Sequence, residues 1–256
     1  MERIQLSDAN QHVEISLFGG HVLRWQAGDQ SVLWLSELAD LSGSSAIRGG
    51  VPICFPWFAE QGSPKHGFAR TQRWQLQQHS QHHAVLVLRD NDTTLAIWPH
   101  KFELTLTVTL APHRLELDLR IHNRDSHSWH CGGALHSYFN CHDARQIELP
   151  RLAERPYFDS LQQGQARQFD CNILPNPIDA IVPDLAEYQL ECGQKLAISQ
   201  HGSDSCVIWN PAFKHPNDVS AAQAMQFICL ESAIARQQIT LAPGQSHHLQ
   251  QQITLC

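Results

Sequence analysis

Apolar and polar residues alternate in many short runs of this chain, and a period of two is typical of β-strands with one buried face. The clearest runs span 103–110 and 115–121, and the Ala111-Pro112-His113-Arg114 segment between them predicts a hairpin turn. Further strands are expected at 13–17, 84–88, 94–98, 195–199, 207–209, 226–230 and 249–255.

Helical periodicity is scarce, and only 32–41 and 219–225 are expected to form short helices. Many strands with frequent proline and glycine between them predict an all-β fold, either a sandwich or a barrel. No internal repeat or long linker divides the chain, so we expect residues 1–256 to form a single domain. The polar, proline-bearing run 150–186 is expected to form long loops or an excursion from the sheets.

Composition narrows the class of protein. With 42% hydrophobic and 17% charged residues the chain is expected to fold as a globular protein. The formal charge of −7 argues against a general nucleic-acid binder, although a local arginine cluster can still hold a small anion. No run approaches the roughly 18 apolar residues of a membrane helix, and no signal peptide is visible. The eight cysteines are scattered without a CxxC pair, which favours reduced thiols in a cytoplasmic protein.

Several common chemistries lack their motifs. The chain contains no GxxxxGK[ST] loop, no GxGxxG after a strand, no GxSxG elbow and no HExxH. Histidines cluster near 79–83 and at 247–248, but those stretches are rich in glutamine and serine and lack cysteine or carboxylate partners. We therefore interpret them as solvated surface residues and expect no metal site.

Two segments carry basic residues next to glycines, which allow backbone conformations that other residues rarely adopt. Arg48 precedes two glycines, which allow close approach of a ligand, and its guanidinium offers a bidentate fork for an anion. The following residues 51–58 are expected to form a buried, rigid crossing segment. The second segment, 65–70, carries Lys65, His66 and Arg70. It is either a solvated basic turn or part of an anion site, and its composition does not decide between them.

Two titratable residues stand in apolar surroundings. His136 lies in an apolar, aromatic segment bounded by glycines, and Glu231 follows the apolar run 227–230, so we expect it at a strand end. A buried carboxylate is costly without a partner. Taken singly, each residue fits a hydrogen-bonded structural role at least as well as a catalytic one.

Five motifs in order resemble one family. They are RGGVPICFPWF at 48–58, HGFAR at 66–70, ALHSYFN at 134–140, WNP at 209–211 and CLES at 229–232. In order and approximate spacing the chain resembles the aldose 1-epimerase superfamily, and more closely its hexose-6-phosphate mutarotase branch. The resemblance covers nearly the whole chain. It implies a galactose-mutarotase-like β-sandwich, which agrees with the strand pattern.

The resemblance also implies roles for individual residues. His136 matches the histidine that acts as general acid toward the ring oxygen, and Glu231 matches the carboxylate that takes the proton from the anomeric hydroxyl. Arg48 and Arg70 match the arginines that hold the sugar phosphate, and His66 matches a histidine lining the same pocket.

The resemblance is weaker at two positions. Asp179, in NPIDAIV, is placed as an aspartate that contacts substrate hydroxyls, although the family motif is closer to ETDRIY. Asp159 is the competing candidate and is more readily interpreted as part of a structural turn. Lys65 stands where some family members have a substrate-binding glutamine, so its contact with phosphate or hydroxyl stays open.

The implied chemistry suits these residue types. Exchange of α and β anomers moves one proton off O1 and one onto ring O5, which one base and one acid can do without metal, nucleotide or other cofactor. Trp57, Phe58 and Trp209 are aromatic candidates for stacking on the sugar. We expect a monomer that acts on hexose 6-phosphates, with glucose 6-phosphate the first candidate.

Three other functions remain open. The same sandwich can serve as a carbohydrate-binding or sensor protein, in which case it leaves anomer exchange unchanged. A general aldose 1-epimerase would act on free sugars. A glycoside hydrolase or lyase is less well supported, because hydrolysis generally uses two carboxylates flanking the bond and only Glu231 is strongly indicated.

Overall fold

The computed structural model describes residues 1–256 and is built almost entirely of antiparallel strands in three sheets. The four-stranded sheet has the order β1 (Arg3–Asp8), β2 (Gln11–Ser16), β3 (His21–Ala27) and β4 (Gln30–Ser31). The seven-stranded sheet has the order β15 (Glu187–Glu191), β16 (Lys195–His201), β19 (Ser246–Leu255), β9 (Arg114–Asn123), β8 (Phe102–Ala111), β7 (His83–Arg89) and β6 (Gln75–His79).

The eight-stranded sheet carries the candidate site. Its order is β13 (Gln165–Gln168), β12 (Pro156–Asp159), β14 (Ile178–Pro183), β17 (Ser205–Asn210), β18 (Phe227–Leu241), β10 (Trp129–Leu135) and β5 (Ile53–Cys54), and β11 (Tyr138–Asn140) also pairs with β18. The helices are α1 (Asp92–Ile97) and the 3-10 turns η1 (Ala69–Thr71), η2 (Ala144–Gln146) and η3 (Ser160–Gln162). The predicted all-β sandwich is confirmed.

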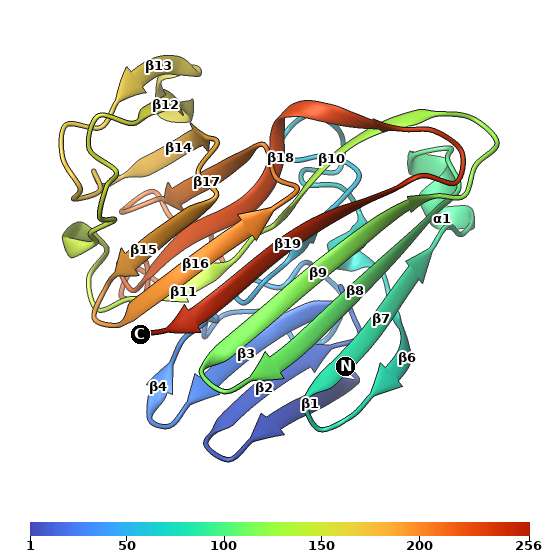
Figure 1. Cartoon of the computed structure of the whole chain (residues 1–256), viewed down its shortest axis with the longest axis horizontal. Coiled ribbons are helices and arrows are strands. Elements are labelled where there is room, and N and C mark those ends of the chain that lie inside the picture. The colour runs from blue at the N-terminus through green and yellow to red at the C-terminus, as the bar shows by residue number, and fades with distance from the viewer.

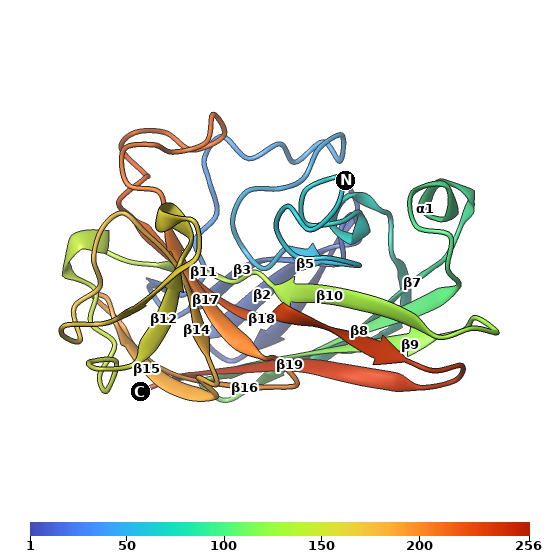
Figure 2. The ribbon, with the colours of Figure 1, turned by 90° about the horizontal axis from the view of Figure 1, so that it is seen from above.

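The seven-stranded and eight-stranded sheets lie face to face, with the four-stranded sheet beside them (Figure 1). Buried and partly exposed residues alternate along all of β8 and β9, so one face of the seven-stranded sheet packs inward. The largest hydrophobic cluster joins 55 buried residues between Leu6 and Ile253 and draws on all three sheets. Figure 2 shows long connections gathered on the side of the eight-stranded sheet that faces away from β19 and β16.

Strand β18 is buried on both faces. Ile228, Leu230 and Ile234 belong to the large core, whereas Cys229 and Ala233 belong to smaller clusters on the opposite face. Because side chains alternate across a strand, the second set points toward the long connections. We call this side of the eight-stranded sheet its outer face. A strand covered on both faces reads as a continuous apolar run, as 227–230 does.

The predicted strand runs are confirmed with one exception, and the 103–121 hairpin is confirmed over its full length. Both predicted helices are wrong. Residues 32–41 are largely extended, with bridges from Leu33 to Phe139 and from Leu35 to Gly49. Residues 219–225 form turns. Trp34, Val219 and Ala224 pack on the outer face, whereas Leu35 packs against Leu23 of β3. This tertiary packing outweighs a weak helical period.

The exception is the run 94–98, which belongs to helix α1 and its C-terminal residue rather than to a strand. The Asn91 side chain accepts a hydrogen bond from the Thr94 backbone N–H at 3.0 Å, and Thr94 Oγ1 accepts one from the Asn91 N–H at 2.9 Å. This reciprocal cap starts a helix in spite of the β-branched residues.

The run 150–186 was expected to be loops, and that expectation is wrong. It contains β12, β13 and β14, which extend the eight-stranded sheet beyond β17. β12 and β13 are only four residues long, and every residue of β13 is exposed, so these segments carry little alternation of apolar and polar residues. The expected buried crossing at 51–58 is confirmed, because all of its residues are buried and β5 pairs with β10.

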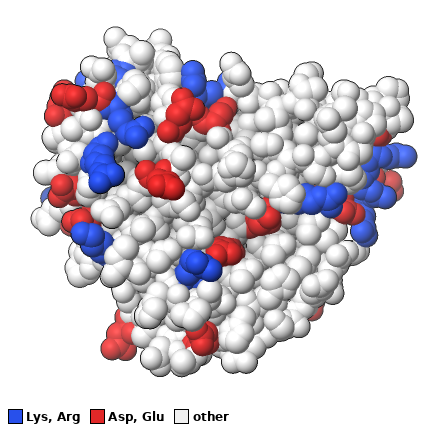
Figure 3. Space-filling model, in the orientation of Figure 1, with Lys and Arg blue, Asp and Glu red and all other residues white.

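The charged residues are mixed on the side seen in Figure 1. Lysines and arginines lie among aspartates and glutamates there, and neither sign forms one broad patch (Figure 3). All eight cysteines are free thiols, and six of them are buried. None of the helices combines the length and apolarity needed to cross a membrane.

Candidate active site

One cavity on the outer face brings together the residues that the sequence proposed for catalysis and substrate binding. It has a volume of about 530 Å³ and opens between the connections that cover β14, β17 and β18. Its lining includes all seven candidates: Arg48, Lys65, His66, Arg70, His136, Asp179 and Glu231. These residues are spread over more than 180 positions of the chain, so only the fold makes them neighbours.

Strand register sets the floor of this cavity. Asp179 on β14 lies opposite Trp209 on β17, and Val207 on β17 lies opposite Glu231 on β18. All four residues occupy alternate positions, so they share the outer face. Trp209 and Phe58 line the cavity, whereas Trp57 does not and instead donates its indole N–H to the Pro64 carbonyl at 2.8 Å.

Glu231 lies inside β18 and not at its end, because the strand continues to Leu241. The expected strand end is therefore wrong. The side chain is buried at 1% exposure, and carboxylate Oε2 has no hydrogen-bond partner. A carboxylate placed in the middle of an apolar strand loses its hydration and gains little in return. The Glu231 carboxylate is therefore free to accept a hydrogen bond or a proton from a ligand that binds in the cavity.

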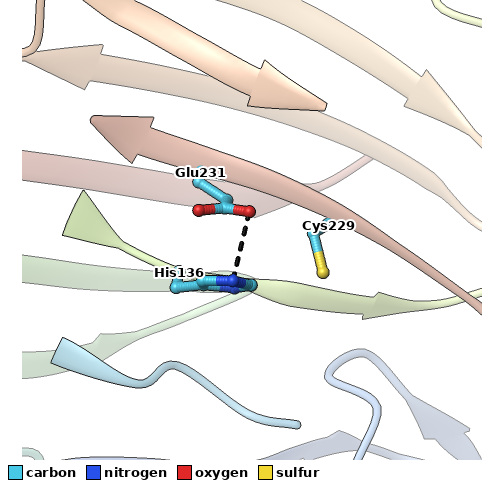
Figure 4. A group of neighbouring side chains, drawn as sticks. All are labelled: His136, Cys229 and Glu231. Atoms are coloured by element: carbon cyan, nitrogen blue, oxygen red, sulfur yellow. Dashed lines mark ion pairs between the residues drawn. The ribbon is translucent and has the colours of Figure 1, made fainter. Parts of the chain in front are cut away.

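His136 lies between two strands and not within one. β10 ends at Leu135, β11 begins at Tyr138, and both pair with β18. This interruption lets the His136 ring stack on Tyr138, with centroids 4.9 Å apart, and face Glu231. The His136 Nε2 and Glu231 Oε1 atoms are 3.3 Å apart (Figure 4).

Burial governs the protonation of this pair. Desolvation lowers the pKa of His136 well below its usual value, and neighbouring His66, Arg48 and Arg70 act in the same direction. Desolvation also raises the pKa of Glu231 well above its usual value, assisted by Asp179. Both shifts favour uncharged groups, so the pair as a whole retains one proton at neutral pH. That proton can reside on either partner, because the two arrangements carry the same total charge.

His66 faces the same pair from the basic loop. The Ala59 backbone N–H donates to His66 Nδ1 at 3.2 Å, so the proton of the neutral ring lies on Nε2. Burial, followed by the charges of Arg70 and Lys65, lowers the pKa of His66 to about 3. The ring is therefore a neutral hydrogen-bond donor, with its centroid 5.3 Å from that of His136.

The glycines near Arg48 were expected to allow close approach of a ligand, but they have a structural role instead. A Cβ on Gly50 would lie 2.2 Å from the Val22 carbonyl oxygen, so the close approach is made by β3 and not by a ligand. Gly67 behaves similarly, with a φ of +70° and a would-be Cβ 1.9 Å from the Phe55 carbonyl oxygen. Both glycines let the loops that carry the basic residues pack tightly on the sheets.

The basic residues of the cavity already make hydrogen bonds or ion pairs within the protein, so only part of their capacity is free for a ligand. Arg48 donates from Nε to Asp218 at 3.0 Å and from Nη1 to the Tyr138 hydroxyl at 2.9 Å. Arg70 donates from Nη2 to the Lys65 carbonyl at 2.7 Å, while its buried Nε has no partner. The exposed ammonium of Lys65 lies 3.3 Å from Glu60. The lysine and both arginines still line the cavity.

Asp179 and Asp159 occupy different surroundings. Asp179 lines the cavity, and burial raises its pKa, partly offset by a hydrogen bond from Ser160. Asp159 accepts the Leu161 backbone N–H at 3.0 Å at the start of η3 and pairs with Arg167 at 3.2 Å. Asp159 is thus a structural turn residue outside this cavity.

Comparisons with known proteins identify the family. The family model described as aldose 1-epimerase matches residues 2–254. The chain belongs to the aldose 1-epimerase family. Relatives from Cenchrus ciliaris and Escherichia coli, both named "Putative glucose-6-phosphate 1-epimerase", are 31% and 30% identical to it. These matches cover 96% and 93% of this chain, and 82% and 85% of the relatives. The resemblance drawn from the motifs is confirmed.

Solved structures share the fold of this chain. A crystal structure from Salmonella typhimurium, described as that of "a putative mutarotase", has a TM-score of 0.88 at 26% identity, covering 99% of this chain and 90% of the other. A galactose mutarotase-like protein from Lactobacillus casei has a TM-score of 0.82 at 17% identity, with both chains covered in full. The second likeness concerns the fold alone and confirms the expected galactose-mutarotase-like architecture.

Three residues near the aldose 1-epimerase motifs escaped the sequence reasoning. Asp218 pairs with Arg48, the Tyr138 hydroxyl accepts from Arg48, and Cys229 lies beside the His136–Glu231 pair. Tyr138 and Cys229 stand inside motifs that were recognised, two positions from His136 and Glu231, so alternation could have flagged them. Asp218 has no such signal, because it lies in a turn region far from Arg48 in sequence.

Proposed function

We propose that this protein interconverts the α and β anomers of hexose 6-phosphates by proton transfer between His136, Glu231 and the sugar. One observation carries the proposal. The buried His136–Glu231 pair lines the same 530 Å³ cavity as Arg48, Arg70 and Lys65, so an acid–base pair and an anion-binding group share one small-molecule site. The glucose-6-phosphate 1-epimerase names of the relatives support this substrate class.

The mechanism uses the single proton of the pair. With the proton on His136, the ring donates it to the sugar's O5 while the Glu231 carboxylate takes the proton of the C1 hydroxyl. The C1–O5 bond breaks and an open-chain aldehyde forms. Rotation about C1–C2 followed by the reverse transfers closes the ring to the other anomer. The intermediate state leaves His136 neutral and Glu231 protonated, which is the arrangement that burial favours.

The remaining lining residues would position the substrate. His66 offers a neutral N–H, and Asp179 offers a carboxylate to sugar hydroxyls from the neighbouring strand. The phosphate would lie toward Arg48, Arg70 and Lys65, which donate charge-assisted hydrogen bonds. Arg70 Nε is buried without a partner, so an anion there would satisfy it. Trp209 and Phe58 supply apolar surface for the sugar ring.

Two-dimensional exchange NMR on glucose 6-phosphate tests the proposal directly. Cross-peaks between the α and β anomeric protons should grow faster with the protein than in buffer alone. A matched sample containing His136→Asn controls for trace contamination by another mutarotase. An unchanged exchange rate for every hexose phosphate tested would reject the enzyme and favour a carbohydrate-binding or sensor protein on the same fold.

A second candidate, a general aldose 1-epimerase acting on free sugars, has one observation in its favour. Asp218 already neutralises part of the Arg48 charge, which weakens the case for a dianionic ligand. The ratio of kcat/KM for glucose 6-phosphate to that for glucose separates the two candidates. A ratio near one would move the assignment to free sugars.

We also propose that the protein acts as a monomer, because residues of one chain supply the whole lining of the cavity. Sedimentation velocity over a range of concentrations tests this. A stable dimer at the concentration used for activity measurements would contradict it.

A further inference from the structure

A third donor group lies beside the His136–Glu231 pair. A ring nitrogen of His136, the Sγ atom of Cys229 and a carboxylate oxygen of Glu231 all lie within 4.8 Å of one another. Cys229 and Glu231 are two positions apart on β18, so both side chains point to the outer face, where they meet the His136 ring (Figure 4). All three side chains are buried.

The spacing of these atoms suits a bound metal ion. For three atoms that are at most 4.8 Å apart, there is always a point within about 2.8 Å of all three. Zinc binds histidine nitrogen and carboxylate oxygen at about 2.0–2.2 Å and thiolate sulfur at about 2.3 Å. Side-chain movements of less than about 1 Å therefore bring the three donors to zinc distances.

The cluster itself, and not the basic residues that also line the cavity, supplies the groups that would hold a cation. Glu231 Oε2 and His136 Nδ1 are buried and have no hydrogen-bond partners, so the cluster has unused polar capacity. His136 and Glu231 line the cavity, which supplies an entry path and room for a water as fourth ligand. One thiolate and one carboxylate would balance the charge of a divalent ion, and a nitrogen–sulfur–oxygen set selects zinc-like ions over magnesium or calcium.

We propose that His136, Cys229 and Glu231 form an inhibitory site for Zn²⁺ or a similar thiophilic divalent cation. On binding, the thiol proton and any proton held by Glu231 pass to solvent, and the ion forms bonds to sulfur, nitrogen and oxygen. The ion then occupies the two groups that exchange protons with the sugar, so metal and substrate exclude one another. The inhibition rests on the proposed function, whereas the metal binding does not.

The test uses the full chain with its two exposed thiols, Cys171 and Cys256, replaced by serine, so that they bind no metal. Zn²⁺ should suppress glucose 6-phosphate exchange in competition with substrate, and a chelator should restore it. Adding Cys229→Ser should preserve the metal-free rate and raise the inhibitory Zn²⁺ concentration at least about tenfold. Cys131→Ser, which changes another buried thiol, is the matched control and should leave the inhibition unchanged.

A second readout does not depend on activity. Co²⁺ added in place of Zn²⁺ should give the charge-transfer absorption of a cobalt–thiolate bond, and Cys229→Ser should remove it. No such band in the parent protein, or equal Zn²⁺ inhibition with and without Cys229, would overturn the proposal. If the protein exchanges no sugar at all, the proposed function fails while the cobalt spectrum still decides the metal site. Cys229→Ala serves as a second variant if the serine substitution prevents folding.

Discussion

Arg48, which lines the cavity, forms an ion pair with Asp218, which lies 170 positions away in sequence. Arg48 Nε donates to both carboxylate oxygens of Asp218, at 3.0 and 3.1 Å, and Nη1 donates to the Tyr138 hydroxyl. Because a guanidinium has five N–H groups, three remain for a ligand. The arginine is thus held in place while part of its charge is neutralised, and both effects bear on phosphate binding.

Replacing Asp218 with asparagine separates these two effects. The amide keeps a hydrogen-bond acceptor for Arg48 but removes a negative charge that opposes a dianionic phosphate. We expect the KM for glucose 6-phosphate to fall about threefold at low salt, with less change at high salt, because the carboxylate is partly exposed. The kcat/KM for glucose should not change. A rise in the KM for the phosphate would mean that holding Arg48 in place outweighs the charge effect.

Alanine at Arg48 or Arg70 should reduce phosphate selectivity. A charge-assisted hydrogen bond contributes about 1.5–3 kcal/mol, so the kcat/KM for glucose 6-phosphate should fall about 10–100-fold. The kcat/KM for glucose should change much less, and the ratio of the two is the measurement. Lys65→Ala is the comparison, because its ammonium is exposed and paired with Glu60, so a smaller loss is expected. An unchanged ratio in both arginine variants would place the phosphate elsewhere.

Glu231→Gln should abolish most turnover while substrate binding is retained. The amide is nearly the same size as the carboxyl group but cannot accept the C1 hydroxyl proton, and general base catalysis typically contributes about 10²–10⁴-fold. The exchange rate at saturating glucose 6-phosphate and the Kd from calorimetry are measured together. Retained activity with a much weaker Kd would make Glu231 a ligand contact and not the base.

His136→Asn should lower kcat at least about 10²-fold, because the side chain no longer donates to ring O5. The ring also stacks on Tyr138, so a loss of folding has to be excluded. Near-ultraviolet circular dichroism and the thermal midpoint of the variant provide that control. A folded variant with a near-normal exchange rate would contradict the role of His136 as the acid.

The pH dependence follows from the shared proton. The raised pKa of Glu231 lets the pair keep its proton as the pH rises, and the lowered pKa of His136 prevents a second protonation as the pH falls. We therefore expect kcat to be level across neutral pH. It should fall on the alkaline side as the pair loses its proton, and on the acid side only when a second proton binds.

Enzyme-free exchange is subtracted at each pH to obtain this profile. Saturating substrate is used because the phosphate itself titrates near pH 6 and would otherwise alter the apparent affinity. A profile centred on the ordinary histidine pKa of about 6.5 would contradict a buried pair that shares one proton.

Several features followed from local sequence. The 103–121 hairpin is predictable because each strand buries one face, so apolar and polar residues alternate along its sequence. The candidate residues were found because they stand inside motifs dense in glycine, proline and aromatic residues. Run 94–98 misled the prediction, since its helix depends on the cap at Asn91, outside the run.

Residues 32–41 show why other parts of the secondary structure could not be predicted from the sequence. Their apolar spacing suggested a helix, yet they pair with Phe139 and Gly49, which are distant in sequence. The packing of these residues against distant parts of the chain outweighs their local helix propensity, and a short stretch of sequence does not reveal that packing. Glu231 is a similar case, because a strand buried on both faces gives no sign of where it ends.

The sequence by itself determined the all-β class, the family and the seven candidate residues that the structure places in the lining of the cavity. Only the tertiary structure decided that His136 meets Glu231 at 3.3 Å, that Asp218 holds Arg48, and that Cys229 is within reach of both members of the pair. The physical reason is that residue types and their spacing fix local pairing and burial. Contacts between strands and turns distant in sequence depend instead on register and packing, which arise only when the sheets assemble.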